Sequence, residues 1–408
     1  MRRCAPGGGR GSATLAACGP YDRRESPVHR PWVGGRAGRV PGWAEHLAES
    51  IRPRSDDLLL QIVAGVAAGD LGDSAIDVET ARRLAWHGLA WDVDRLAIPA
   101  VYTSPEAAAT ISNASRRALM RSMSVAVVAN RVARTLADAN VPALVYKGPA
   151  LAFETTGTFL GRGSADVDFL VNPAQLGDVH RALVADGLSR RDGDAGPPGR
   201  LTMFQECERS YVGAGIDVDL HWRIDSTPGY FSEPFEALWA RRREVSAAGL
   251  EVWAPGASDA LVMTAVHGTR EMWVRLRWVL DAVRQFRLLS PAQWPEVCSV
   301  ANAGARKAVA VALAISEICG VDDLPARPGR WARSMAEAYL AAVASTSPAD
   351  ARAAETSALA AWSRRVNRWQ TADTQRTALD GVARATFRQV VGDTQKSLLR
   401  RGPGQARP

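Results

Sequence analysis

Acidic residues alternate with apolar residues in two short segments of the sequence. Side chains of a β-strand point alternately to its two faces, so Asp166 and Asp168 share one face of the first segment. In the same way, Asp217, Asp219 and His221 share one face of the second. Carboxylates gathered like this repel one another unless a cation lies among them, and hard oxygen ligands suit Mg²⁺. The two segments therefore predict a magnesium site; the alternative is solvated strand acids that bind no metal.

A glycine turn precedes the first acidic segment. Tyr146, Lys147 and Gly148 lead into a helical sequence, and such a turn offers backbone N–H groups and a helix N-terminus to an anion. The chain has 50 Lys and Arg residues, of which only three are lysine. The compact charge of Lys147 therefore favours a phosphate contact, with composition bias as the alternative explanation. Arg162 and Ser164, just before the acidic segment, add a second cation and a hydroxyl.

Together these motifs resemble the uncharacterised nucleotidyltransferase family of bacterial proteins, within the DNA polymerase β-like superfamily. The resemblance covers about residues 80–290. Its segments are Lys147-Gly148-Pro-Ala-Leu151, Arg162-Gly-Ser-Ala-Asp166-Val-Asp168-Phe-Leu-Val171, Asp217-Val-Asp219-Leu-His221-Trp222-Arg223, His267-Gly268 and Trp273-Val-Arg-Leu-Arg-Trp278-Val-Leu-Asp281. An isolated Asp-x-Asp motif is a weak signal, but the ordered combination is specific. The superfamily's usual Gly-Ser turn is Lys147-Gly148 here, so the triphosphate contacts need not follow the superfamily pattern.

The resemblance implies a transferase that moves a nucleoside monophosphate from a nucleoside triphosphate (NTP) to an acceptor. It implies Asp166, Asp168 and Asp219 as catalytic metal ligands, with Asp217 in reserve for the third position. Two Mg²⁺ ions that share a carboxylate would clamp the in-line displacement. The sequence does not identify the acceptor, which is a hydroxyl or another nucleophile, or the preferred base.

Residues outside the acidic segments are expected to contact the nucleotide. Lys147, Arg162 and Ser164 would contact phosphate oxygens, with Gly148 in the turn beside them. His267 would line the nucleotide pocket from the helical side. The alternatives are phosphoryl transfer on the same fold and a non-catalytic protein that binds nucleotides or nucleic acid.

Other polar and aromatic residues near these motifs have structural explanations. His221 either supports the carboxylates or is a hydrogen-bonded packing residue. Arg277 and Asp281, four residues apart on a predicted helix, are expected to form an intrahelical ion pair. Trp273 and Trp278 are expected to pack rather than to stack on a base.

Three short apolar segments, 142–146, 167–171 and 216–220, predict the strands that position these residues. Segment 173–187 predicts an amphipathic helix between the second and third strands. This alternation predicts a mixed α/β or α+β fold. Its small nucleotidyltransferase-type sheet core spans 141–255, with the two acidic strands as neighbours in one sheet.

Helical sequences flank the predicted core on both sides. Region 43–140 is predicted to be helical, and its longest helix, 105–139, begins after the N-cap Ser104. Region 256–401 predicts a helical C-terminal domain. Its basic part, from about residue 330, is expected to form a wall of the acceptor cleft or a partner surface.

The net charge of +7 is concentrated at the two ends of the chain. Residues 1–45 carry +5 and residues 324–408 carry +8, whereas the middle is acidic. A nucleic-acid partner is therefore not favoured. Segment 1–42 predicts a disordered basic tail and segment 402–408 a flexible one, because neither has apolar periodicity.

No membrane attachment is predicted. The longest nearly uncharged apolar stretch has 12 residues, whereas a spanning helix needs about 20. Arg2 and Arg3 are not followed by the apolar region of a signal peptide, so a cytoplasmic location is expected. The five cysteines form no Cys-x-x-Cys pair, which predicts neither a zinc cluster nor a disulfide framework. The oligomeric state is not predicted.

Overall fold

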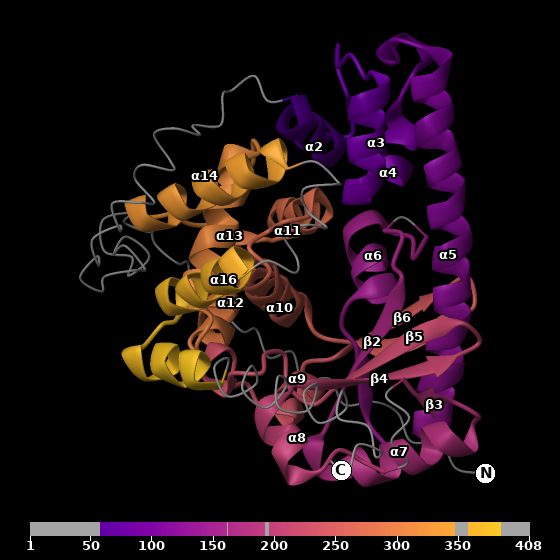
Figure 1. Cartoon of the computed structure of the whole chain (residues 1–408), viewed down its shortest axis with the longest axis vertical. Coiled ribbons are helices and arrows are strands. Elements are labelled where there is room, and N and C mark those ends of the chain that lie inside the picture. Colours follow the sequence, from indigo (N-terminus) through magenta and orange to yellow (C-terminus); the bar gives the residue numbers. More distant parts are fainter. Residues whose placement is uncertain (1–57, 161, 192–195, 347–357, 385–408) are drawn as a thin grey trace, which may run out of the picture.

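The computed structural model describes residues 58–160, 162–191, 196–346 and 358–384. It contains a five-stranded mixed sheet, seen at the lower right of Figure 1. The strands lie in the order β1 (Ala143–Val145), β2 (Asp166–Val171), β5 (Ile216–His221), β4 (Glu208–Gly213) and β3 (Ser189–Arg190). The β2–β5 pairing is parallel and the other three are antiparallel. A hairpin of β6 (Arg243–Ala247) and β7 (Leu250–Ala254) forms a separate two-stranded sheet.

One face of the five-stranded sheet is apolar. Val167 and Phe169 of β2 and Val218 and Leu220 of β5 have 0% exposed surface. The long helix α5 (Pro105–Asp138), at the right of Figure 1, packs on this face, and so does α7 (Leu176–Ala185). Alternate residues of these strands are thus removed from water, and the acidic residues between them point to the opposite face.

The opposite face of the sheet meets helices that follow it in the chain. Leu170 of β2 belongs to a core cluster shared with α10 (Ala257–Arg270), α11 (Leu276–Leu288) and α13 (Arg306–Ile318). The helices before the sheet, α2 (Leu58–Ala68), α3 (Val78–His87) and α4 (Ala90–Leu96), contribute to the same cluster. The N-terminal and C-terminal helices therefore share one apolar core.

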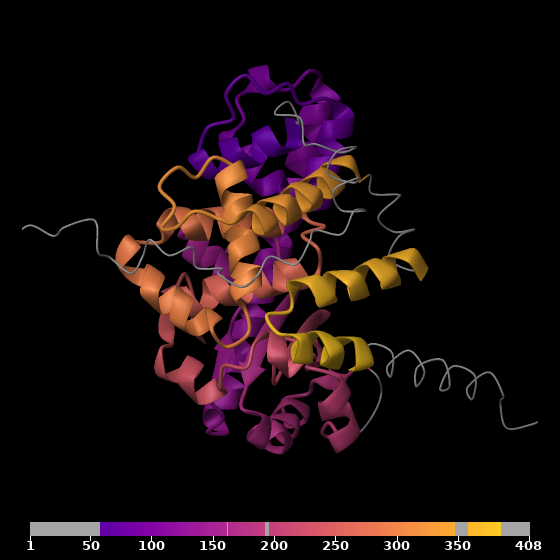
Figure 2. The same cartoon turned by 90° about the vertical axis from the view of Figure 1, so that its left-hand side faces the viewer.

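The remaining helices lie around these layers. They include α6 (Gly148–Thr156), α8 (Arg200–Gln205), α9 (Phe235–Ala240), α12 (Trp294–Ala301), α14 (Arg330–Ser345) and α16 (Ala358–Thr371). Short 3₁₀ turns occupy Pro99–Val101, Pro173–Gln175, Pro228–Tyr230 and Pro291–Gln293. Figure 2 shows α14 and α16, in orange and yellow, on the side of the molecule away from α5.

The predicted fold class is confirmed. The acidic strands β2 and β5 are neighbours in one sheet, and α5 begins after Ser104, whose side chain accepts a hydrogen bond from the Ala107 N–H. The sequence did not predict β3, β4 or the β6–β7 hairpin. The predicted tails, 1–42 and 402–408, lie outside the described residues, as do 347–357 and 385–401 of the predicted C-terminal helical region. Among the described helices, none has the length and apolar character needed to cross a membrane.

Candidate active site

The parallel pairing of β2 with β5 brings the acidic residues together. The paired residues are Asp166 with Asp217, Asp168 with Asp219 and Leu170 with His221. Paired residues on neighbouring strands present their side chains to the same face of the sheet. The register therefore places the predicted carboxylates side by side on the face opposite α5.

Asp168 is the most enclosed of these carboxylates. Its Oδ1 lies 3.2 Å from Nζ of Lys147 and 3.0 Å from Nε2 of His221. Burial alone would raise the pKa of Asp168, but the ammonium of Lys147 and the hydrogen bond from His221 hold it well below its usual range. Asp168 is therefore ionised, and Lys147 and His221 balance its charge.

Asp166 and Asp219 lie in a less favourable environment. Burial, and then repulsion from Asp168, raises the pKa of Asp166. Burial also raises the pKa of Asp219, although the Ser210 hydroxyl donates a hydrogen bond to its Oδ1 at 2.5 Å. A cation placed among these oxygens would relieve the repulsion, and an all-oxygen donor set fits Mg²⁺.

Asp217 and Asp219 differ in their partners. Asp217, on the central strand β5, forms an ion pair with Arg191, which follows the edge strand β3; the side chain of Asp217 is 32% exposed. Asp219 is paired in register with Asp168, and the negative charge of Asp168 contributes to the raised pKa of Asp219. Asp219 therefore lies under the charge of Asp168, whereas the charge of Asp217 is balanced by Arg191.

The Lys147-Gly148 turn is fitted closely against the start of β2. Lys147 is the N-cap of α6, and Gly148 has a φ of +55°. A Cβ at position 148 would lie 3.2 Å from Oγ of Ser164 and 3.4 Å from the carbonyl oxygen of Asp166. Glycine therefore allows both the left-handed turn and the close approach of α6 to the acidic strand.

Arg162 connects the loop before β2 to helix α11. Its Nε lies 2.9 Å from Oδ2 of Asp281, and both side chains are buried. Arg277 donates hydrogen bonds to the carbonyl oxygens of Arg162 and Gly163 at 3.3 and 2.9 Å. The predicted intrahelical ion pair between Arg277 and Asp281 is therefore wrong. Each of these two side chains contacts the loop before β2 instead.

His267 lies beside Lys147 in a small pocket. The other lining residues include Arg162, Trp278 and Asp281, and the pocket volume is about 10 Å³, roughly the space for one water molecule. Burial, with the charges of Lys147 and Arg270, lowers the pKa of His267 well below its usual value. His267 is therefore a neutral ring, packed edge to face against Trp278, in a pocket too small for a nucleoside.

The chain matches the model of a known protein family. The model of a family described as "Uncharacterised nucleotidyltransferase" matches residues 80–319, more than half of the chain. The chain belongs to this family. Its general function is therefore that of a nucleotidyltransferase, and the resemblance stated from the motifs is confirmed. The search of curated proteins found no match.

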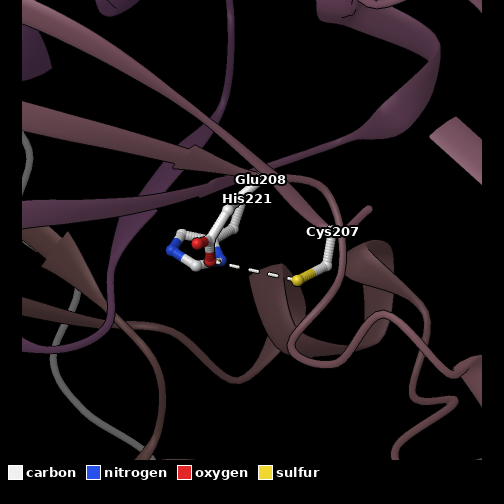
Figure 3. A group of neighbouring side chains, drawn as sticks. All are labelled: Cys207, Glu208 and His221. Atoms are coloured by element: carbon white, nitrogen blue, oxygen red, sulfur yellow. Dashed lines mark hydrogen bonds and ion pairs between the residues drawn. The ribbon is translucent and has the colours of Figure 1, made fainter. Parts of the chain in front are cut away.

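The protein also has polar residues beside the site that its sequence motifs did not reveal. Strand β4 pairs Glu208 with His221 and Ser210 with Asp219. Nδ1 of His221 lies 3.1 Å from Oε2 of Glu208, and Sγ of Cys207 lies 3.9 Å from the same oxygen (Figure 3). The alternation of Glu208 and Ser210 was the available signal, but these residues lie outside the motifs.

His221 lies between two carboxylates, those of Asp168 and Glu208. Burial would lower its pKa, but the hydrogen bond to Asp168, the neighbouring Cys207 and the charge of Glu208 raise it to about 9. His221 thus lies against Asp168 as a buried ring with a raised pKa, and both a supporting role and a packing role are compatible with this position.

Proposed function

We propose that the protein transfers a nucleoside monophosphate from an NTP to a nucleophilic acceptor in a Mg²⁺-dependent reaction. The observation that carries this proposal is the register of β2 with β5, which sets Asp168 beside Asp219 with Asp166 on the same face. Membership of a nucleotidyltransferase family supports it. The proposed metal ligands are Asp166, Asp168 and Asp219.

Bound Mg²⁺ would neutralise the phosphates of the NTP and lower the pKa of an acceptor hydroxyl. Lys147 is already held beside Asp168 at 3.2 Å, so its ammonium is in place to contact a phosphate once the carboxylate is otherwise neutralised. Arg162 and Ser164 approach each other to 3.4 Å in the loop before β2 and would supply further donors.

The roles of Gly148 and His267 follow from their packing. A side chain at Gly148 would press on Ser164 and on the start of β2, so glycine keeps the phosphate-facing turn open. His267 would line the inner end of the nucleotide site as a neutral ring. Because the pocket around His267 is so small, the nucleoside would lie outside it, towards the open side of the carboxylates.

The position of a radioactive label tests the reaction type. The protein is incubated with Mg²⁺, each NTP labelled at the α or the γ phosphate, and a library of alcohols, sugars, peptides, proteins and nucleic-acid ends. Transfer of the α label to an acceptor is expected. Transfer of the γ label alone would show phosphoryl transfer and overturn the proposal.

Variants connect that transfer to the carboxylates. Asp166→Asn and Asp168→Asn should each lower transfer by roughly 100-fold or more, because each removes a negative charge that would hold the metal ions. Asp138→Asn, an exposed change at the end of α5, is the matched control and should be silent. Full activity of both site variants would exclude the proposed mechanism.

A further inference from the structure

A mixed set of sulfur, oxygen and nitrogen atoms lies where β4 begins and β5 ends. Cys207 immediately precedes β4, and Glu208 pairs in register with His221. One ligand atom from each of the three residues lies within 4.8 Å of the other two (Figure 3). Residues from two strands and a loop thus converge on one point beside the proposed Mg²⁺ site.

His221 presents its Nδ1 to this point. Its side chain is 1% exposed, and Nδ1 lies 3.1 Å from Oε2 of Glu208 without the alignment of a hydrogen bond. The other nitrogen, Nε2, is 3.0 Å from Oδ1 of Asp168. A histidine that binds a metal through one nitrogen commonly donates the other N–H to a carboxylate, which fixes the ring. Asp168 holds the ring of His221 in this way.

The interatomic distances suit a small cation. In a tetrahedral site with zinc-like bond lengths, the nitrogen and oxygen ligands are about 3.3 Å apart, and the sulfur and oxygen ligands about 3.6 Å. The corresponding separations are 3.1 Å between Nδ1 of His221 and Oε2 of Glu208, and 3.9 Å between Sγ of Cys207 and that oxygen. These separations differ from the tetrahedral values by only about 0.2 and about 0.3 Å, which small side-chain rotations would remove.

The sulfur decides the class of cation. Mg²⁺ is bound through oxygen ligands, whereas thiolate and imidazole together favour zinc and similar transition metals. Cys207 is buried, but the side chain of Glu208 is 42% exposed and leaves a route of entry from solvent. Three protein ligands leave a fourth position for water.

We propose that Cys207, Glu208 and His221 bind a zinc-type divalent cation at a site separate from that of Mg²⁺. The cation replaces the protons on the Cys207 thiol and on Nδ1 of His221, and these protons pass to solvent. It would then fix the ring that donates to Asp168, so His221 would be a positioning residue for that carboxylate. The metal site itself does not depend on the proposed transfer reaction.

Cobalt substitution tests the site directly in the full-length protein. The metal-free protein is titrated with Co²⁺, and the thiolate-to-cobalt absorption band is recorded. We expect one equivalent of Co²⁺ to give this band, Zn²⁺ to displace it, and excess Mg²⁺ to leave it in place. Absence of the band, or its loss to Mg²⁺, would overturn the proposal.

Two variants assign the ligands. Cys207→Ser should abolish the band and weaken Zn²⁺ binding by more than the roughly 100-fold that loss of a merely supporting residue costs. Cys298→Ser, a partly buried cysteine in α12, is the matched control and should retain it. A band that survives Cys207→Ser would place the cobalt at another cysteine and contradict the assignment.

Thermal unfolding provides a second readout. Zn²⁺ should raise the Tm of the wild type, because a ligand that binds the folded state stabilises it, and should raise the Tm of Cys207→Ser much less. If Cys207→Ser fails to fold, Glu208→Gln replaces it, because that partly exposed side chain can change without creating a cavity. An equal rise in Tm for wild type and Glu208→Gln would then count against the site.

Discussion

The charge on Asp168 organises the residues around it. Lys147 and His221 both contact its Oδ1, whereas Asp166 and Asp219 have raised pKa values because they are buried near a carboxylate that stays ionised. In this site the negative charge of Asp168 is therefore balanced by neighbouring cationic groups. The carboxylates of Asp166 and Asp219 are instead repelled by Asp168. Such a cluster gains more from a bound cation than a set of fully paired acids would.

Asp217 and Asp219 provide a residue-scale prediction. Asp219→Asn should lower Mg²⁺-dependent transfer by roughly 100-fold or more, whereas Asp217→Asn should retain most activity, because Asp217 already forms an ion pair with Arg191. Both variants replace an aspartate of β5 with asparagine, so each serves as the control for the other. The activity of both is measured as transfer of the α label to the acceptor. The opposite result would assign the third position to Asp217 and leave the mechanism intact.

At the scale of elements, α10 and α11 support the site through the turn that joins them. Gly268 of α10 faces Trp273, which has 0% exposed surface, and a Cβ at position 268 would lie 2.6 Å from two atoms of its ring. Met272 and Trp273 have φ values of +53° and +52°. The His267-Gly268 motif therefore combines a pocket residue with a packing contact that needs glycine.

Gly268→Ala should destabilise the protein by about 1–3 kcal/mol, because the buried ring cannot move away from the added methyl group. Helix propensity alone would favour alanine by about 1 kcal/mol, so packing decides the sign. Gly177→Ala in α7 is the control: its Cβ would lie 3.6 Å from Nη1 of Arg181, an ordinary contact, so it should be neutral or slightly stabilising. Denaturant unfolding measures both, and equal effects would contradict the packing argument.

His87 of α3 contacts the first residue of α11 through a hydrogen bond that only its neutral ring can accept. Its Nδ1 accepts a hydrogen bond from the Leu276 N–H at 3.3 Å. Burial, with the charges of Arg275 and Arg83, lowers the pKa of His87 from 6.5 to about 3. The folded state therefore keeps this histidine neutral over a range in which the unfolded chain binds a proton.

The contribution of neutral His87 to stability is complete above pH 6.5 and is lost as the pH falls towards about 3. His87→Asn keeps an acceptor but removes the titration. Its unfolding free energy should fall less steeply with acidification than that of the wild type, by up to about 1.4 kcal/mol per pH unit. Denaturant melts between pH 7 and pH 4 measure this difference, and parallel curves would rule it out.

At the scale of the whole molecule, α16 closes over the loop that follows β5. Nη1 of Arg368 lies 3.0 Å from Oδ1 of Asp225, whose side chain is 1% exposed. Nδ2 of Asn367 donates to the carbonyl oxygen of Thr269 at 2.7 Å, which fastens α16 to α10. The basic C-terminal region thus contributes part of its charge to a buried contact, and its proposed role as a wall of the acceptor cleft remains a prediction.

Arg368→Ala should destabilise the protein by about 3–5 kcal/mol, because it leaves Asp225 as a buried carboxylate without this partner. Asp225→Asn in the same background should recover part of the loss. Arg82→Ala, which removes an exposed pair with Glu106, is the control and should cost no more than about 1 kcal/mol. Thermal unfolding checks the series, and similar losses for Arg368→Ala and Arg82→Ala would contradict the buried pair.

The sequence by itself determined the local features of this protein. Period-two alternation in β2 and β5 fixed which side of each strand carries acids, because side-chain direction in a strand depends only on position. The N-cap Ser104 and the following proline fixed the start of α5 for a similarly local reason. The order of the motifs was enough to indicate the family, which the family match confirms.

Only the tertiary structure decided which distant residues meet. The sequence predicted that Arg277 pairs with Asp281, one helical turn away. In the folded protein Arg277 instead donates to the carbonyl oxygens of Arg162 and Gly163. Asp281 forms its ion pair with Arg162. Cys207 and Glu208 carried no recognisable metal motif, because their spacing to His221 is set by antiparallel strand pairing rather than by a short repeat. Contacts of this kind depend on the register between strands and the packing of helices, which no local pattern specifies.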